Sequence, residues 1–375
     1  MHTPIRRLIG LASLSAVAAF ASCSSGGQEE PRTTPTGPNG RTLPWPQSLT
    51  FEFARRPDTL PTRWRGLVGE YGPDTATRLI ALERDQRLTI LDKSGYYTPL
   101  SERNDSVFEA PLSTAAVSGN LTFHRDSTGR GTSLQMGDMV LQRRRIEPPS
   151  GANQLRITPV HDVDSLRVQA LAARPPAESG LFKQPDLVEV TTLDTTLRLE
   201  IRYAGSNNFL GTKIYEQARA FMQRPAAEAL ARASRAAHML GFGLLIHDAY
   251  RPWYVTKIFW DATPDSLRWM VANPAEGSKH NRGAAVDLSM YELRSGKIVE
   301  MPSTYDESTT RAYANYPGGT ALQRWNRAIL RRVMEHEGFA VNPQEWWHFD
   351  YRDWKSYPIL NIPFDQVRPA PRAQK

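Results

Sequence analysis

The chain of 375 residues has only one cysteine, Cys23, and it has no hydrophobic stretch long enough to span a membrane. A single cysteine excludes a disulfide scaffold and any zinc or iron–sulfur site built from several thiolates. A spanning helix needs roughly 20 apolar residues, which no segment provides. The net charge is +7, but the sequence has no Lys/Arg-rich run with interleaved aromatic residues. Nucleic acid is therefore not an expected partner.

The remaining composition is that of a globular protein. Hydrophobic residues make up 40% of the chain and charged residues 23%, which excludes disorder, collagen and coiled coil as descriptions of the whole chain. The length suggests roughly two domains with additional segments. The sequence contains no internal repeat.

Residues 1–22 have the pattern of a signal peptide, with a basic start at Arg6 and Arg7 and an apolar stretch over Leu8–Ala21. The stretch ends at Phe20-Ala21-Ser22-Cys23, which resembles a bacterial lipobox, although Phe20 stands where leucine is usual. This resemblance implies lipidation of Cys23 and a membrane-anchored, periplasm-facing lipoprotein of the cell envelope. The alternative is an ordinary signal peptide with an incidental cysteine.

Composition and patterning divide the rest of the chain. Residues 23–46 are rich in Ser, Gly and Pro and predict a flexible tether. Short alternating runs predict a small all-β, barrel-like domain over 47–145, for binding or with a purely structural role. Residues 146–186 predict a connector, 187–365 a domain of mixed helices and strands, and 366–375 a tail. The strands expected in the all-β region are Thr77–Leu82, Arg87–Leu91, Tyr96–Leu100, Leu121–Arg125 and Thr132–Leu141.

Within 187–365, Pro225 and Gly241 are typical of the start and end of one helix, and Leu322–Glu337 predicts a second helix. Leu244–His247 predicts a buried strand and Ala284–Met290 another.

The predicted strand Ala284–Met290 carries an acidic residue, Asp287, on the face opposite Val286 and Leu288. A buried Asp costs several kcal/mol unless it is paired or binds a metal. His280 lies in a loop just before this strand and can fold back towards Asp287. The alternative is a surface histidine and an Asp paired with an arginine.

Two further motifs carry charged side chains. In Glu345-Trp346-Trp347-His348, residues three apart would point to opposite faces of a regular strand, so Glu345 is expected in the loop just before the strand and His348 within it. The alternative is an aromatic core run with one hydrogen-bonded histidine. Arg251 follows the strand Leu244–His247, where it can stabilise an oxyanion or simply pair with Asp248.

Taken together, the three motifs predict a zinc site with catalytic groups beside it, which none of them predicts alone. His280, Asp287 and His348 make a three-ligand zinc site with an open fourth position. Glu345 is then placed as a general base and Arg251 as an electrophile.

Ser278-x-His280-x-x-Gly283-x-Ala285-x-Asp287 and Glu345-x-Trp347-His348 resemble the motifs of the zinc D-alanyl-D-alanine dipeptidases, including the vancomycin-resistance type. The segments Asp248–Pro252, Tyr203…Asn208-Phe209-x-Gly211 and Met301–Asp306 are also similar to that family. The resemblance covers roughly residues 187–365.

This resemblance implies an α+β zinc peptidase domain with an antiparallel sheet and flanking helices. It implies one Zn²⁺ per chain held by His280, Asp287 and His348, with Glu345 and Arg251 catalytic. It also implies a small D-amino-acid dipeptide as substrate, bound by Ser278, Asp306 and Tyr203.

Two departures from the family keep other functions open. The segment between Arg251 and His280 is shorter than usual, and Thr309-Thr310-Arg311 replaces a Ser-His pair. These segments help close a small pocket. One alternative is therefore a D,D-carboxypeptidase or endopeptidase acting on peptidoglycan stem peptides, and another is a non-catalytic zinc-containing wall-binding lipoprotein. A serine hydrolase is disfavoured because no Ser-x-x-Lys or Gly-x-Ser-x-Gly motif has a suitable context.

Overall fold

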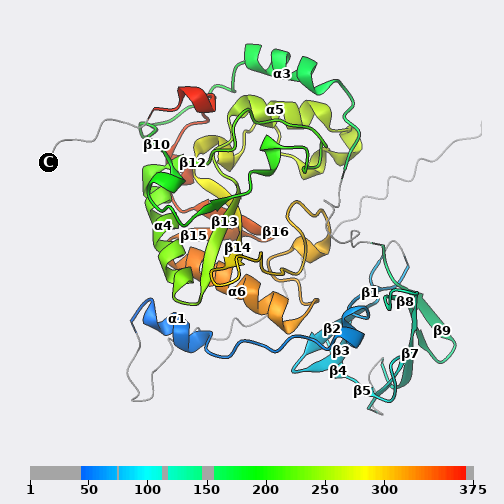
Figure 1. The fold of residues 1–375 in the computed structure, drawn as a ribbon. Coiled ribbons are helices and arrows are strands. Elements are labelled where there is room, and N and C mark those ends of the chain that lie inside the picture. Colours follow the sequence, from blue (N-terminus) through cyan, green and yellow to red (C-terminus); the bar gives the residue numbers. More distant parts are fainter. Residues whose placement is uncertain (1–43, 74–75, 112–116, 146–155, 369–375) are drawn as a thin grey trace, which may run out of the picture. The chain divides into compact units, whose positions relative to one another are not determined.

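A five-stranded sheet with the strand order β11-β13-β14-β16-β15 carries Asp287, Glu345 and His348. Strands β13, β14, β15 and β16 are labelled in Figure 1. The computed structural model describes residues 44–73, 76–111, 117–145 and 156–368. The strands are β11 (Arg198–Leu199), β13 (Phe242–Asp248), β14 (Ala285–Glu292), β15 (Phe339–Asn342) and β16 (Glu345–Tyr351). Neighbouring strands are antiparallel except β11 and β13, which are parallel. The expectation of an antiparallel sheet was therefore wrong at this edge and is confirmed elsewhere.

The central strand β14 alternates between a core face and a site face, as its sequence predicts. Val286 and Leu288 belong to the hydrophobic core, whereas Asp287 and Ser289 are buried polar residues on the opposite face. Because β13 on one side and β16 on the other are also buried, polar side chains on this face are kept away from bulk water.

Two long helices pack with the sheet (Figure 1). Helix α4 (Arg224–His238) has a proline in its first turn, and Gly241 lies in the left-handed region just beyond its end. Its buried face is rich in alanine, so the helix approaches β13 and α6 closely. Helix α6 (Ala321–His336) begins with a capping box formed by Thr320 and Gln323. Both helices confirm the sequence-based expectation.

The same region contains shorter elements. Helix α5 (Trp253–Ala262) follows the Arg251 segment, and β10 (Leu187–Glu189) pairs antiparallel with β12 (Phe221–Gln223). The 3₁₀ turns are η1 (Val190–Thr192), η2 (Arg202–Ala204), η3 (Asp265–Met270), η4 (Lys279–Arg282), η5 (Thr310–Ala312), η6 (Trp354–Ser356) and η7 (Phe364–Gln366).

Residues 69–142 contain two antiparallel sheets that share one hydrophobic core. One sheet contains β1 (Gly69–Tyr71), β2 (Leu79–Arg84), β3 (Arg87–Asp92) and β4 (Tyr97–Pro99). The other contains β5 (Ser101–Glu102), β6 (Val107–Ala110), β7 (Gly119–Arg125), β8 (Gly131–Met136) and β9 (Met139–Gln142). Asp85 and Gln86, both with positive φ, form the expected turn between β2 and β3.

Two expectations for the secondary structure were wrong. Thr132–Leu141 is two strands, β8 and β9, because Gly137 adopts a positive φ and allows a turn within one continuous alternating pattern. The start of the region expected to be all-β forms two short helices, α1 (Gln47–Glu52) and α2 (Thr62–Arg65).

The predicted connector contains a helix that the sequence analysis did not name, α3 (Val163–Ala172). Asp162 caps α3 by accepting a hydrogen bond from the Ser165 backbone N–H, and Leu166 and Ala170 join the hydrophobic core around the five-stranded sheet. The domain boundaries given above stay predictions.

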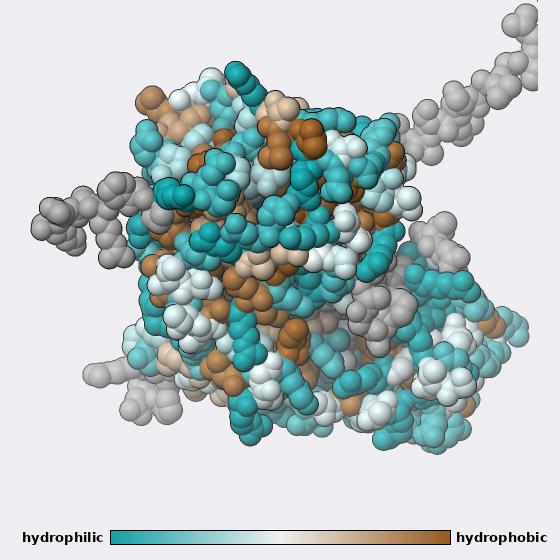
Figure 2. Space-filling model, turned by 45° about the horizontal axis from the view of Figure 1, so that its top comes forward, coloured by the Kyte–Doolittle hydropathy of each residue, from teal (hydrophilic) through white to brown (hydrophobic). Residues whose placement is uncertain are grey.

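The predicted signal peptide 1–22, Cys23 and most of the predicted tether 23–46 lie outside the described residues, as do residues 369–375 of the predicted tail. Among the described residues, none of the helices combines the length and apolar character needed to cross a bilayer. The face drawn in Figure 2 is largely hydrophilic, with hydrophobic residues in small separate groups.

Candidate active site

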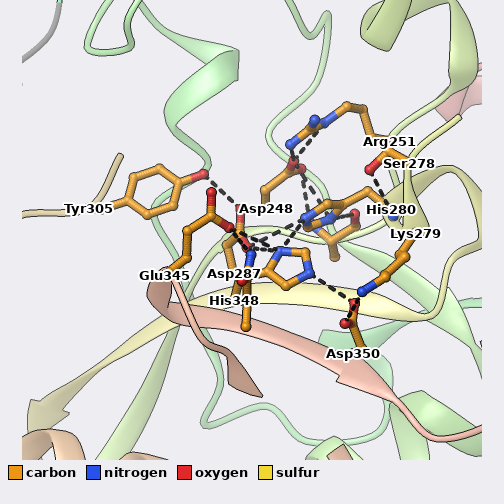
Figure 3. A network of polar contacts seen from close by, with 12 residues as sticks. Asp248, Arg251, Ser278, Lys279, His280, Asp287, Tyr305, Glu345, His348 and Asp350 are labelled. Atoms are coloured by element: carbon orange, nitrogen blue, oxygen red, sulfur yellow. Dashed lines mark hydrogen bonds and ion pairs between the residues drawn. The ribbon is translucent and has the colours of Figure 1, made fainter. Parts of the chain in front are cut away.

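Two histidines and an aspartate converge in the structure although they come from three separate elements (Figure 3). His280 Nε2 lies 3.1 Å from His348 Nδ1 and 3.4 Å from Asp287 Oδ1. His348 Nδ1 lies 3.0 Å from the same Asp287 oxygen. All three side chains are buried. This arrangement can hold a divalent cation.

Sheet register and a capped turn bring these side chains together. Asp287 on β14 is directly opposite His348 on β16, so the two side chains share one face of the sheet. His280 lies on η4, where Ser278 and Asn281 form a capping box. Gly283 ends this turn with φ 66°, a left-handed conformation, and an added Cβ would lie 2.5 Å from Leu187. The position therefore requires glycine.

His280, Asp287 and His348 also form hydrogen bonds with residues outside the cluster, through atoms that face away from its centre. The carbonyl oxygen of Ala249 lies 2.7 Å from His280 Nδ1, and a carboxylate oxygen of Asp350 lies 2.9 Å from His348 Nε2. The hydroxyl of Tyr305 donates to Asp287 Oδ2. Both histidines thus have one nitrogen engaged with an acceptor and the other turned towards Asp287, as metal-binding histidines usually have.

The charges of this cluster are strongly coupled. Burial by itself would raise the pKa of Asp287, but the charge of His280 and hydrogen bonds with both histidines lower it overall. Burial would lower the pKa of His348, but hydrogen bonds to Asp287 and Asp350 raise it to about 10. Binding of a cation would therefore displace a firmly held proton.

Glu345 is the first residue of β16 and lies beside this cluster, with Oε2 3.8 Å from His348 Nδ1. Its expected position in a loop before the strand was wrong. A register irregularity between Val341 and Asn342 in the β15–β16 pair lets Glu345 and His348 approach each other although they are three residues apart. Asn342 donates a hydrogen bond of 2.9 Å to the Glu345 carboxylate.

The environment of Glu345 suits a group that exchanges protons. Its side chain is 38% exposed, yet its carboxylate lies within a cavity where desolvation raises its pKa. The charges of His348 and His280 oppose this shift, while Asp287 adds to it.

Arg251 is fixed by a buried carboxylate. Its Nε and Nη2 donate to Asp248 Oδ2 at 3.0 and 2.7 Å. This is the pairing with Asp248 that the sequence analysis gave as the alternative to oxyanion binding. Arg251 also lines the cavity, so pairing with Asp248 does not exclude a part in binding. Tyr215 and the backbone N–H of Ala249 donate to the other oxygen of Asp248 and hold it in place.

The structure also brings together Tyr203 and Asp306, which are about a hundred residues apart in the chain. The Tyr203 hydroxyl donates to Asp306 Oδ2 at 2.8 Å, and both residues line the cavity. Burial, reinforced by the charge of Asp287, raises the pKa of Asp306 to about 7. Ser278 lines the same cavity, but its hydroxyl accepts a hydrogen bond from the His280 backbone N–H at 3.2 Å.

The cavity has a volume of about 630 Å³ and contains every catalytic, metal-binding and substrate-binding residue expected from the sequence. Trp269 and Tyr313 also line it and are 70% and 42% exposed.

Sequence reasoning missed the contacts of Tyr305, Asp350 and Lys279. A signal for Asp350 was present, because it is two residues after His348 and so shares its strand face. Tyr305 lies within the segment Met301–Asp306 noted above, but the sequence did not indicate its contact with Asp287. The contact of Lys279 with Asp350 joins residues 71 positions apart and gave no local signal.

Comparisons with known proteins agree with this geometry. A family model described as D-ala-D-ala dipeptidase matches residues 183–366. The chain is 35% identical over 175 residues to the D-alanyl-D-alanine dipeptidase of Escherichia coli strain K12, a match covering 47% of this chain and 89% of that protein. It is 33% identical over 180 residues to the Enterococcus faecium protein of the same name, covering 43% and 89%. A Streptomyces coelicolor protein, also so named, is 30% identical over 186 residues, covering 45% and 92%.

Proposed function

Because this chain belongs to the D-alanyl-D-alanine dipeptidase family of peptidases, we propose that it hydrolyses the free D-alanyl-D-alanine dipeptide with one bound zinc ion and Glu345 as general base. The observation that carries the proposal is the convergence of His280, Asp287 and His348 next to a carboxylate with a raised pKa. The substrate would be a cell-wall precursor or a product of wall recycling.

The donor atoms fit zinc. Ligands about 2.0–2.1 Å from a tetrahedral ion lie about 3.3 Å from one another. The three distances between the donor atoms of His280, Asp287 and His348 are 3.0, 3.1 and 3.4 Å. Two imidazoles and one carboxylate are a common zinc donor set, and three protein ligands leave a fourth position open.

When bound, zinc supplies a Lewis acid that polarises a carbonyl and lowers the pKa of water towards about 7. Glu345 takes a proton from the attacking water and delivers it to the leaving amine. Arg251, held by Asp248, presents a fixed positive charge to the oxygen that becomes negative in the transition state. Asp306, with Tyr203 beside it, binds the ammonium group of the dipeptide, while Ser278 helps to hold the substrate.

A second candidate function is favoured by the size of the cavity and by its exposed aromatic residues. A volume of about 630 Å³ exceeds what two alanine residues need, since pockets of roughly 300–1,000 Å³ hold drug-sized ligands. Trp269 and Tyr313 could contact a longer peptide. A D,D-carboxypeptidase or endopeptidase on stem peptides would use the same zinc-binding residues and Glu345.

One assay separates these functions. The zinc-loaded full chain is incubated with D-Ala-D-Ala, with N-acetyl-D-Ala-D-Ala and with a stem pentapeptide ending in D-Ala-D-Ala. We expect cleavage of the free dipeptide, and cleavage of the acetylated one about 10²-fold more slowly because its ammonium group is lost. Release of D-Ala from the pentapeptide at a similar kcat/KM would establish the second function instead. Zinc binding without cleavage of any of the three substrates would contradict both hydrolytic functions.

The pKa of Asp306 predicts how dipeptide binding depends on pH. Protonation below pH 7 removes the negative charge that binds the ammonium group, so affinity should fall roughly 15-fold in total as the pH drops from about 7 to 5.5. Calorimetry with the Glu345→Gln variant measures binding without turnover. Adding Asp306→Asn should weaken binding at pH 7.5 and remove the slope. An unchanged slope in the double variant would show that another group binds the amine.

We also propose that Cys23 carries a lipid anchor and that the protein faces the periplasm from a membrane of the cell envelope. The proposal rests on the apolar leader and on the resemblance of residues 20–23 to a lipobox. Metabolic labelling with a fatty acid should mark the wild type and leave Cys23→Ala unlabelled. Labelling of Cys23→Ala would contradict it.

A further inference from the structure

The two histidines of the site differ in what holds their outer nitrogens. His280 Nδ1 faces a backbone carbonyl, that of Ala249. His348 Nε2 faces a side chain, the carboxylate of Asp350, at 2.9 Å. Only the partner of His348 can therefore be altered by substitution, and it is a charged acceptor, which makes the stronger hydrogen bond.

Asp350 occupies a place on the sheet that brings its carboxylate to His348. It follows His348 by two residues on β16, so both side chains project from the same face. Its cross-strand neighbours are Ala285 on β14 and Ala340 on β15, whose small side chains leave room for it. The side chain is 11% exposed, so the hydrogen bond to His348 is largely shielded from water.

Lys279 binds the second carboxylate oxygen of Asp350. Its ammonium donates to Asp350 Oδ2, while Oδ1 faces His348 (Figure 3). Lys279 directly precedes His280 on η4, and its ammonium lies 5.2 Å from the ring centroid of Trp354. The Lys279–Asp350 pair therefore connects the turn that carries His280 to the strand that carries His348.

We propose that Asp350, held by Lys279, is a positioning residue that fixes the ring orientation and tautomer of His348 and thereby sets the metal affinity of the site. With the proton on Nε2 donated to Asp350, the lone pair on Nδ1 is directed towards Asp287 and His280. The ammonium group of Lys279 offsets the negative charge of Asp350. This inference rests on the proposed zinc site.

The proposal predicts graded effects on zinc affinity. Asp350→Asn retains the shape but replaces a charged acceptor by a neutral one, and should weaken zinc binding about 10–100-fold. Lys279→Met retains the His348–Asp350 contact but frees the carboxylate to move, and should weaken binding by a smaller factor. Asp350→Ala removes the acceptor and should weaken binding at least as much as Asp350→Asn.

A nearby ion pair provides the control. Asp353 forms a 2.7 Å ion pair with Lys183, and Asp353→Asn removes a Lys–Asp pair that does not involve His348. The zinc dissociation constant of each full-chain variant is measured by competition with a fluorescent chelator. Thermal unfolding of the metal-free proteins and the visible spectrum of the cobalt(II)-loaded proteins are recorded in parallel.

We expect Asp350→Asn to lose zinc affinity and alter the cobalt spectrum while its metal-free melting temperature stays close to that of the wild type. Asp353→Asn should match the wild type in zinc affinity and cobalt spectrum. A zinc dissociation constant for Asp350→Asn within twofold of the wild-type value would overturn the inference, as would a lowered melting temperature with unchanged affinity. If Asp350→Asn fails to fold, unchanged affinity and an unchanged cobalt spectrum in Lys279→Met would overturn it. A wild type that binds no zinc would instead refute the proposed function.

Discussion

Replacing Glu345 by glutamine should reduce kcat for D-Ala-D-Ala by about 10³-fold or more while zinc remains bound. General acid–base groups contribute roughly 10²–10⁴-fold to rates, and Glu345 is proposed to act in both proton transfers. Glutamine keeps the size and can still receive the hydrogen bond from Asn342, so the cavity should retain its shape. Steady-state kinetics and the zinc content of the purified variant measure the two effects separately.

A neighbouring position controls for general disturbance. Gln344 also lines the cavity, just before β16, and is exposed. Gln344→Ala should retain activity within a few-fold. Near-wild-type turnover by Glu345→Gln would show that another group is the base. Loss of zinc from that variant would mean that Glu345 acts as a ligand.

Replacing Arg251 by lysine should lower kcat by about 10²–10³-fold with little change in KM. This is the range for loss of one oxyanion donor, and a lysine cannot pair with Asp248 through two nitrogens and still present a third to the substrate. Lysine retains the positive charge that Asp248 needs. Removing that charge altogether would leave a buried carboxylate unpaired, at a cost of about 3–5 kcal/mol in stability. Kinetics and thermal unfolding of Arg251→Lys therefore separate catalysis from folding.

The matched control is another arginine that binds a carboxylate through two nitrogens. Arg219 contacts Glu189 through Nε at 3.0 Å and Nη2 at 2.7 Å. Arg219→Lys should leave kcat unchanged. Arg251→Lys with the same kcat as the wild type would limit Arg251 to a structural pairing with Asp248.

The sequence predicts elements well where local signals agree with each other. Helices α4 and α6 combine a suitable first turn, a periodic apolar face and a following glycine, and both form within a few residues of their expected limits. The alternation in β14 correctly predicts which face carries Asp287. The β13–β14–β16 register then brings together side chains that the motifs named separately.

The rest depends on contacts that sequence patterns do not record. The position of Glu345 depends on an irregularity in the β15–β16 register, which ordinary strand periodicity does not reveal. Helix α3 has a weak apolar pattern, and it contacts α5, far along the chain. The contact of Lys279 with Asp350 joins residues separated by 71 positions, so neither residue's neighbours indicate it.

Because Asp287 pairs directly with His348, the proposed zinc ion would bind tightly only when β14 and β16 are correctly aligned. A shift of β16 by one residue along β14 would turn His348 to the opposite face and bring either Trp347 or Phe349 towards the ligand position. Misaligned chains would then lack one donor and bind the cation weakly. Supplying the metal during refolding should enrich the correctly aligned sheet, because a ligand favours the conformation that binds it.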